Sequence, residues 1–260
     1  MKKYVLDLVI CRVSFPAAQY VLLCCNGGDE HLPEICPGQF AQLRIDRGKQ
    51  TFLRRPISIH YVDYASNEIS FLIQIKGEGT RSLASMQVGD ILNAVLPLGN
   101  GFTLPRQGED GILLVGGGVG VAPLLYMGKR MNDIGCRPTF LLGARSKSDL
   151  LLVDEFQKQG DVFLTTEDGS MGEKGYVTQH SLLQEHGFSR ICVCGPKPMM
   201  MAVAKYAAAW KIPCEVSLEN MMACGVGACL CCVEDIKERG HVCVCKEGPV
   251  FNINDLKWQI

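Results

Sequence analysis

The sequence feature that most constrains this chain is a dense group of cysteines near its C-terminus. Six of the 14 cysteines lie within residues 224–245, a stretch with too little apolar sequence to fold without help. Cys224, Cys229 and Cys232 follow the spacing C-x4-C-x2-C. This spacing, with a fourth cysteine further along, is typical of plant-type [2Fe–2S] clusters. The segment is therefore predicted to fold around a [2Fe–2S] cluster, which indicates a protein that moves electrons.

The loop between the first two of these cysteines suits such a cluster. Gly225 and Gly227 permit positive φ angles, so the backbone can turn tightly and bring N–H groups near the sulfur atoms. The fourth ligand must come from elsewhere, and Cys243 and Cys245 both qualify. We favour Cys245, because a Lys-Glu-Gly-Pro turn follows it and can fold the chain back over the cluster.

A zinc site is the alternative, because zinc also accepts four thiolates. Structural zinc usually takes its ligands from two short cysteine knuckles. Here the first pair is separated by four residues that include two glycines, and this pattern favours the iron–sulfur interpretation.

The remaining composition indicates a protein with no nucleic-acid or membrane partner. The net charge is −1 and no basic stripe is present, so neither nucleic acid nor an anionic membrane surface is an expected partner. No apolar stretch approaches the roughly 20 residues that span a bilayer. The many cysteines occur without an export signal, which predicts a soluble, cytoplasmic protein with reduced thiols. Cysteines outside the C-terminal group are expected to be small buried hydrophobes.

Residues 1–102 are predicted to form an antiparallel β-barrel domain. Short β-rich runs alternate there with Gly, Pro and Asn, without a long helical period. The expected strands cover residues 4–13, 20–25, 39–45, 57–61, 68–75 and 91–96.

Residues 103–212 are predicted to form an α/β domain with a parallel sheet, followed by a small C-terminal module at 213–260. The continuous apolar run at 112–115 is typical of a parallel strand buried on both faces. Strands and helices then alternate, as in nucleotide-binding βαβ units. The expected elements are a helix at 121–131, a strand at 139–142, a helix near 150–158, strands at 162–165 and 191–194, and a helix at 197–210.

Two turns of this domain are candidates for nucleotide binding. The first follows the apolar run directly and consists of Gly116, Gly117, Gly118, Val119 and Gly120. Its glycines let the backbone approach a pyrophosphate at the N-terminus of the helix that follows. The second, Cys194-Gly195-Pro196, ends a later strand and can face the same ligand, because ligands of open α/β sheets lie across the carboxyl ends of the strands.

The barrel also carries candidate anion-binding residues. Arg54 and Arg55 stand at the start of a strand, and arginine can hold a diphosphate with two parallel hydrogen bonds. Residues 76–80 form another turn that can receive an anion.

In combination, these motifs resemble the ferredoxin–NADP reductase superfamily. Arg55-Pro56-Ile57-Ser58, Gly77 to Thr80, Gly116 to Pro123 and Cys194-Gly195-Pro196 occur in the order of its FAD and NAD(P) motifs. Residues 217–220, 222–229, 232 and 244–251 resemble, more specifically, the electron-transfer subunit of class 1B dihydroorotate dehydrogenase.

The resemblance implies three cofactors: FAD, NAD and a [2Fe–2S] cluster. It implies these FAD-binding residues: Arg55, Pro56, Ile57, Ser58, Leu72, Ile73, Gln74, Gly79 and Thr80. It implies that NAD binds the two nucleotide turns, and that the cluster ligands are Cys224, Cys229, Cys232 and Cys245. No catalytic residue is expected in this chain.

The resemblance also implies a partner. This is an FMN-containing catalytic subunit that oxidises dihydroorotate to orotate in pyrimidine synthesis, in a heterotetramer of two copies of each subunit. Electrons would pass from FMN through the cluster and FAD to NAD⁺. The residues alone leave NAD and NADP open, because Arg145 follows the second parallel strand, where an acidic residue would favour NAD.

Two other functions are alternatives. One is a different electron-transfer subunit of the same superfamily, linked to ferredoxin or a hydrogenase. The other is a zinc-stabilised nucleotide-binding interaction module without redox activity.

Overall fold

The computed structural model describes residues 2–46, 51–185 and 187–258. The chain divides into two compact units, each assembled from separate stretches of sequence. The first, the barrel unit, contains Met1–Gly101, Glu219–Glu234 and His241–Pro249. The second, the α/β unit, contains Phe102–Leu218, Asp235–Gly240 and Val250–Ile260. Within the part of the chain that the structure describes, no helix is long and apolar enough to cross a membrane.

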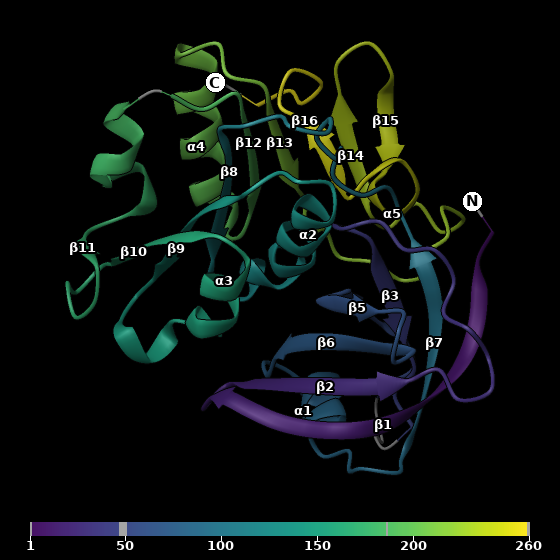
Figure 1. The fold of residues 1–260 in the computed structure, drawn as a ribbon. Coiled ribbons are helices and arrows are strands. Elements are labelled where there is room, and N and C mark those ends of the chain that lie inside the picture. Colours follow the sequence, from purple (N-terminus) through teal and green to yellow (C-terminus); the bar gives the residue numbers. More distant parts are fainter. Residues whose placement is uncertain (1, 47–50, 186, 259–260) are drawn as a thin grey trace. The chain divides into compact units, whose positions relative to one another are not determined.

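The barrel unit is built on a seven-stranded antiparallel sheet with the order β4-β3-β7-β1-β2-β6-β5 (Figure 1). Its strands are β1 (Tyr4–Ala17), β2 (Tyr20–Asn26), β3 (Phe40–Leu43), β4 (Arg55–Ser58), β5 (Tyr61–Asp63), β6 (Glu68–Gln74) and β7 (Ile91–Leu98). In β1, Leu6, Leu8 and Ile10 are buried and alternate with more exposed residues, as expected for a strand with one face toward the core. The predicted antiparallel barrel fold is confirmed, with the sheet forming a half-barrel.

Two local features of this unit differ from the sequence-based expectation. The single strand expected at 57–61 is divided between β4 and β5. Ile59 N donates to Gln39 O beside β3, whereas His60 N donates to Ser70 O of β6, so the chain crosses from one edge of the sheet to the other at this point. In addition, the turn expected at 76–80 is largely helical, because helix α1 (Glu78–Ala84) begins within it. Thr80 lies in the first turn of this helix. Its Oγ1 accepts hydrogen bonds from Lys76 N and Gly77 N and so caps the helix N-terminus.

The α/β unit contains a second seven-stranded sheet, with the order β11-β10-β9-β8-β12-β13-β16. Its strands are β8 (Ile112–Gly117), β9 (Thr139–Ala144), β10 (Asp161–Thr166), β11 (Glu173–Lys174), β12 (Arg190–Cys194), β13 (Cys214–Ser217) and β16 (Val250–Asn252). All pairs are parallel except β13 with β16. The predicted βαβ pattern is therefore confirmed, with the helices and strands close to their expected positions.

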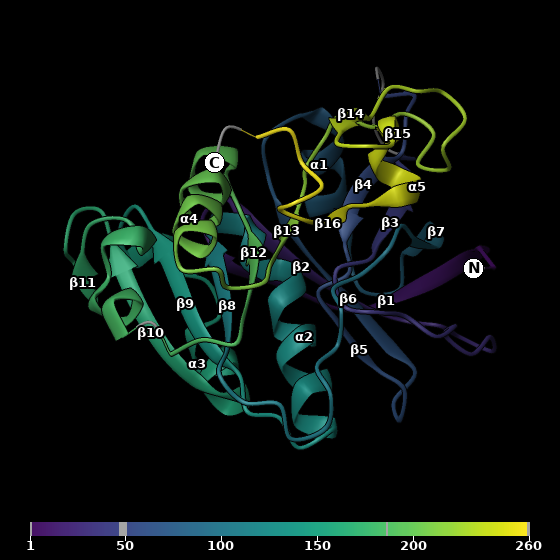
Figure 2. The ribbon, with the colours of Figure 1, turned by 90° about the horizontal axis from the view of Figure 1, so that it is seen from above.

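Helices cover both faces of this sheet (Figures 1 and 2). The helices are α2 (Ala122–Asp133), α3 (Val153–Gln159) and α4 (Lys197–Ala209), and the 3-10 turns are η1 (Gly118–Val121), η2 (Lys147–Asp149), η3 (Val177–Gln179) and η4 (Ser181–Glu185). Helices α2 and α3 lie on one face and α4 on the other. Because both faces are covered, the central strand β8 is apolar, and its residues from Ile112 to Val115 are all buried.

The end of the chain contributes to both units. The expected boundary between residues 212 and 213 falls just before β13, yet the parallel sheet continues through β13 and gains β16 at its edge. Between these strands the chain forms the hairpin β14 (Val233–Ile236) and β15 (Gly240–Cys243) and the short helix α5 (Val244–Glu247). The predicted module at 213–260 is thus shared between the two compact units.

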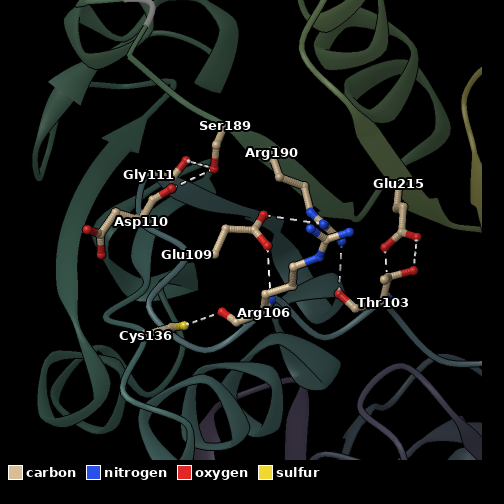
Figure 3. A network of polar contacts seen from close by, with 9 residues as sticks. All are labelled: Thr103, Arg106, Glu109, Asp110, Gly111, Cys136, Ser189, Arg190 and Glu215. Carbon is tan, nitrogen blue, oxygen red and sulfur yellow. Dashed lines mark hydrogen bonds and ion pairs between the residues drawn. The ribbon is translucent and has the colours of Figure 1, made fainter.

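A polar network joins the first residues of the α/β unit to the start of its strands (Figure 3). Glu215 accepts hydrogen bonds from Thr103 N at 3.0 Å and Thr103 Oγ1 at 2.6 Å. Arg190 donates to Thr103 O at 3.3 Å and pairs with Glu109 at 3.3 Å. These contacts hold segment 103–111 against β12 and β13, so the strand β8 that follows enters the sheet in a defined register.

Candidate functional site

The cysteine loop directs backbone N–H groups at sulfur atoms. The N–H groups of Val226, Ala228 and Cys229 point at Cys224 Sγ from 3.3–3.4 Å. Gly225 and Gly227 have φ angles of +70° and +83°, which glycine adopts without strain and which produce this tight turn. The loop therefore surrounds one of its own sulfurs with donors, as expected for a loop that holds thiolates.

The two candidate fourth ligands differ in their surroundings. Cys245 Sγ accepts a hydrogen bond from Gly227 N at 3.1 Å, and Cys245 N points at Cys232 Sγ from 3.4 Å. Cys243 Sγ instead points at the carbonyl oxygen of Gly227 from 3.8 Å. Cys245 thus receives the kind of donor that stabilises a thiolate, whereas Cys243 meets an acceptor. This difference favours Cys245, as the sequence does.

The segment that carries Cys245 is held by the loop after β7. Asn100 Nδ2 donates to the carbonyl oxygens of Lys246 and Glu247 at 3.3 and 3.0 Å, and Asn100 N donates to Gly248 O at 2.6 Å. A side chain at Gly99 would lie 2.5 Å from Gly248 O, so glycine is needed for this approach. The barrel unit therefore positions the cysteine that the sequence places far from the other three.

The hydrogen bonds of the loop also change thiol acidity. Hydrogen bonds from the backbone, the largest from Val226, lower the pKa of Cys224 to about 6. Burial raises the pKa of Cys245 to about 12, and its proximity to Cys232 adds to this. Without a bound cation, the Cys224 thiol is therefore more acidic than an ordinary cysteine, and the Cys245 thiol is less acidic. Among the described residues, no group of three His, Cys, Asp or Glu side chains is arranged to hold a single metal ion.

The predicted flavin residues of the barrel unit lie around an open part of its sheet. β4 pairs with β3 and with no other described strand, while β5 pairs with β6 only as far as Ser70. The backbone at Leu72, Ile73 and Gln74 therefore has a described strand partner, β2, on one side only. All four residues of β4 are half-buried.

Arg55 and Arg54 have different surroundings. A side chain at Gly79 would lie 2.6 Å from Arg55 Nε, so the guanidinium of Arg55 packs directly on the first turn of α1, and it donates to Leu53 O at 2.9 Å. Arg54 instead donates to Asn93 Oδ1 at 2.5 Å and to the carbonyl oxygens of Gln42 and Asn93. Arg54 thus joins β3 to β7 and is a structural residue, which leaves Arg55 as the candidate for phosphate binding.

The two predicted nucleotide turns of the α/β unit lie against each other. Gly116 and Gly117 end β8, and Gly118, Val119 and Gly120 form the 3-10 turn before α2. A side chain at Gly120 would lie 2.5 Å from Cys194 O and from Gly195 N. The first turn therefore packs directly on the second, and this arrangement agrees with the prediction that both can face one ligand.

The position of these turns in the sheet is informative. From β8 the chain builds outward through β9 and β10 on one side, and then through β12 and β13 on the other. β8 and β12 therefore flank the point where the strand order reverses, and open α/β sheets bind ligands at the carboxyl ends of strands at this point. Gly118 and Val119 remain half-exposed there.

Cysteines outside the loop mostly fill the core, as expected. Cys24, Cys25, Cys136, Cys192 and Cys214 are buried. Burial raises the pKa of Cys214 to about 12, so this thiol stays protonated and unreactive. Cys11 is exposed and Cys36 half-buried, which departs from the expectation for these two.

Comparison with known proteins places the chain in a family. Residues 219–257 match the iron-sulfur cluster binding domain of dihydroorotate dehydrogenase B, and residues 114–205 match the oxidoreductase NAD-binding domain. The dihydroorotate dehydrogenase B (NAD(+)) electron transfer subunit of Shouchella clausii is 39% identical over 85% of this chain and 86% of its own. This chain belongs to the family of dihydroorotate dehydrogenase B electron transfer subunits. The counterpart in Caldanaerobacter subterraneus is 41% identical over 83% of this chain and 84% of its own.

Solved structures agree on the fold. The NADH-dependent reduced ferredoxin-NADP oxidoreductase, studied for flavin-based electron bifurcation, superimposes with a TM-score of 0.83 and 29% identity, over 97% of this chain and 90% of its own. The ferredoxin reductase of carbazole 1,9a-dioxygenase superimposes with a TM-score of 0.70 at 18% identity, over 82% of this chain and 68% of its own. The predicted family, fold and cofactor set (FAD, NAD and an iron–sulfur cluster) are confirmed. A family of electron transfer subunits also implies a catalytic partner subunit.

Sequence reasoning did not identify the barrel residues that face the cysteine segment. Asn100 lies in a Pro-Leu-Gly-Asn-Gly stretch, whose composition predicts a turn and a domain boundary. Gln42 lies in the buried run of β3, beside Ala41 and Leu43. A polar residue within such a run was the available signal, because buried polar side chains need partners.

Proposed function

We propose that this chain passes electrons from the FMN of a catalytic partner subunit through a [2Fe–2S] cluster and FAD to NAD⁺. The partner would oxidise dihydroorotate to orotate in pyrimidine synthesis. The observation that carries the proposal is the set of backbone N–H groups directed at Cys224 and Cys245, in a chain 39% identical to dihydroorotate dehydrogenase B electron transfer subunits.

The cysteine segment suits an iron–sulfur cluster. Cys224, Cys229, Cys232 and Cys245 would be its ligands, and the N–H groups already directed at Cys224 and Cys245 would stabilise their negative sulfurs. Cys231 falls outside the C-x4-C-x2-C spacing and Cys243 faces a carbonyl oxygen, so neither is included in the proposed set.

The barrel unit supplies the proposed FAD site. Arg55 would bind the phosphates together with the first turn of α1, where Gly79 leaves room for the guanidinium. Pro56, Ile57 and Ser58 would line the flavin along the open edge of β4, and the backbone of residues 72–74 would flank it.

The α/β unit supplies the proposed NAD site at the carboxyl ends of β8 and β12. Gly116 to Gly120 would approach the pyrophosphate at the N-terminus of α2, and Cys194, Gly195 and Pro196 would lie beside it. Arg145 is 73% exposed and pairs weakly with Asp149 at 3.6 Å. We propose NAD and not NADP because the relatives carry NAD(+) in their names.

Bound together, the cofactors would connect one-electron transfer at the cluster with two-electron hydride transfer to the nicotinamide. The residues of this chain hold, orient and shield these groups. We assign no general acid or base for dihydroorotate to this chain. We also propose two copies of each subunit in the complex, and a cytoplasmic location, where thiols remain reduced.

The test is to co-express the chain with its catalytic partner and purify the complex without oxygen. We expect FAD, FMN, iron and acid-labile sulfide in the complex, and reduction of NAD⁺ on addition of dihydroorotate. NADP⁺ should be reduced far more slowly. Iron and sulfide absent from the native complex, or zinc in their place, would overturn the proposal.

A second candidate function follows from the similarity to the NADH-dependent reduced ferredoxin-NADP oxidoreductase. In that case reduced ferredoxin, and not dihydroorotate, would supply electrons to the purified chain. Stopped-flow reduction of the flavin with each donor distinguishes the two functions.

A further inference from the structure

Gln42 is a buried polar residue whose side chain has no partner among the described residues. It lies on β3, opposite Pro56 of β4, and is 1% exposed. Neither Gln42 Nε2 nor Gln42 Oε1 makes a hydrogen bond within the described part of the chain. A buried amide in this condition loses its hydration without compensation, so native proteins rarely keep one without a reason.

The side chain of Gln42 packs directly on the cysteine loop. A side chain placed at Gly225 would lie 2.6 Å from Gln42 Cγ and 2.7 Å from Gln42 Nε2. Gly225 follows Cys224 and has a φ of +70°, so both the close approach and the backbone conformation require glycine. The carboxamide therefore lies against the backbone of the loop that carries three of the proposed ligands.

Gln39, a buried glutamine three residues before Gln42, has a structural role and serves for comparison. Gln39 Oε1 accepts from Cys36 N at 2.8 Å, and Gln39 Nε2 donates to Gly99 O at 2.7 Å. Both polar ends of Gln39 are used to hold loops of the barrel unit. Gln42 is equally buried, but its side-chain amide makes no hydrogen bond to the described residues. Its partner is therefore expected to be the group that the cysteine loop binds.

We propose that the side-chain amide of Gln42 donates a hydrogen bond to a sulfur atom of the cluster held by the cysteine loop. This inference rests on the proposed function, which places a [2Fe–2S] cluster there. The loop already directs three backbone N–H groups at Cys224 Sγ, and Gln42 adds a donor from strand β3. Hydrogen bonds to cluster sulfurs set the reduction potential, because they stabilise the more negative, reduced form. Gln42 thus raises the potential of the cluster.

The flavin is the competing partner, because Pro56 lies opposite Gln42 on the neighbouring strand and paired residues share one face of a sheet. The contact with Gly225 favours the cluster, since it places the amide against the cysteine loop. The experiment below separates the two partners.

The test compares wild type, Gln42→Met and Gln42→Glu in the complete complex, purified without oxygen. Methionine keeps the length of the side chain and removes the donor, and glutamate keeps the shape and offers only acceptors. We expect each variant to retain iron and sulfide. In each, the equilibrium between the oxidised and reduced cluster should shift about tenfold toward the oxidised form, so that the reduction potential falls by about 59 mV for one electron. Potentiometric titration followed by EPR measures this shift. Asn26→Leu is the control: it removes a side-chain amide of β2 that is bonded to Ser66 O and Gly28 N, and should lower thermal stability without changing the potential.

A second measurement detects the hydrogen bond directly. With ¹⁵N in the side-chain amides of glutamine, pulsed EPR of the reduced wild-type cluster should show a nitrogen coupling that Gln42→Met lacks. An intact cluster with unchanged potential and no such coupling would overturn this inference alone, and so would a change confined to the flavin. A native complex without iron and sulfide would overturn the proposed function and this inference with it.

Discussion

Two glycine-rich turns of this protein differ in what determines their shape. In the turn at 116–120, glycine is needed because neighbouring backbone fills the space: a side chain at Gly120 would meet Cys194 and Gly195 at 2.5 Å. In the loop at 224–232, Gly225 and Gly227 have positive φ angles that turn backbone N–H groups toward sulfur, and the nearest atoms to a side chain placed there belong to the side chains of Gln42 and Lys246, not to backbone. The first turn is therefore part of the packed sheet, whereas the second is organised around the group that it binds.

This difference shows that the same residue type can prepare a binding site in two ways. The nucleotide turn follows a strand that is buried throughout and precedes a mostly buried helix, so it should keep its shape without ligand. The cysteine loop has few buried apolar side chains, and Cys229 and Cys231 are exposed. Its order should therefore depend on the cluster, because metal binding and folding are coupled in such segments.

The largest expected effect concerns the cysteine loop. Cys232→Ser removes a buried thiol that contacts Cys245 N, and should abolish electron flow from the partner to NAD⁺. Oxidation of NADH by an artificial two-electron acceptor should continue, because the flavin and nucleotide sites remain. Steady-state assays of both reactions measure the effect.

Cys231→Ser is the matched control for this prediction, because Cys231 is the exposed neighbour and is not a proposed ligand. It should retain both activities and the full iron content. If Cys232→Ser keeps both activities, the ligand assignment is wrong.

The next effect concerns the nucleotide turn. Gly120→Ala forces a side chain into backbone atoms of the neighbouring turn and should lower the free energy of unfolding by about 3 kcal/mol. A side chain at Gly118 would have no other atom within 4 Å, so Gly118→Ala causes only the backbone strain of a φ of +55°. It should lower the free energy of unfolding by about 1 kcal/mol. Thermal unfolding of the cluster-free protein compares them. Equal losses would show that the packing of this turn does not determine its shape.

A third effect sharpens the contrast, because the same substitution in the cysteine loop should act on the cluster. Gly225→Ala brings a methyl group against Gln42 and places alanine at a positive φ. The loop that holds the cluster should be destabilised by about 1 kcal/mol, so iron should be released to a chelator about fivefold faster. Gly240→Ala is the matched control, since its φ is also positive, at +64°, and nothing lies within 4 Å. If both variants lose iron at the same rate, backbone strain and not the loop geometry explains the result.

The smallest effect concerns a surface ion pair of the α/β unit and does not depend on either turn. Arg137 donates two hydrogen bonds to Asp161, and these lower the pKa of this carboxyl group. A carboxyl group whose pKa is lower in the folded state stabilises the fold at pH values above the ordinary pKa of aspartate. This stabilisation is lost as the pH falls through the folded-state pKa. Arg137→Gln should therefore reduce stability slightly at neutral pH and not in strong acid. Since the pair is solvent-exposed, a large change in unfolding temperature at neutral pH would contradict the prediction.

Much of the fold was predictable because its signals are local. The apolar run at 112–115, followed by glycines and a helix, predicted β8, the nucleotide turn and α2, since buried parallel strands need continuous apolar sequence. The division of residues 57–61 between β4 and β5 was not predictable. It depends on hydrogen bonds from Ile59 to β3's neighbour Gln39 and from His60 to Ser70, and local sequence does not specify these partners.

The sequence by itself determined the chemistry of the cysteine segment, because the spacing of Cys224, Cys229 and Cys232 is a local property of the chain. Only the tertiary structure decided that β13 and β16 extend the parallel sheet, that Asn100 holds the segment with Cys245, and that Gln42 packs on Gly225. The physical reason is that spacing and periodicity describe neighbours along the chain. The partner of a buried amide or of a sheet edge is chosen instead by packing between segments that are distant in sequence.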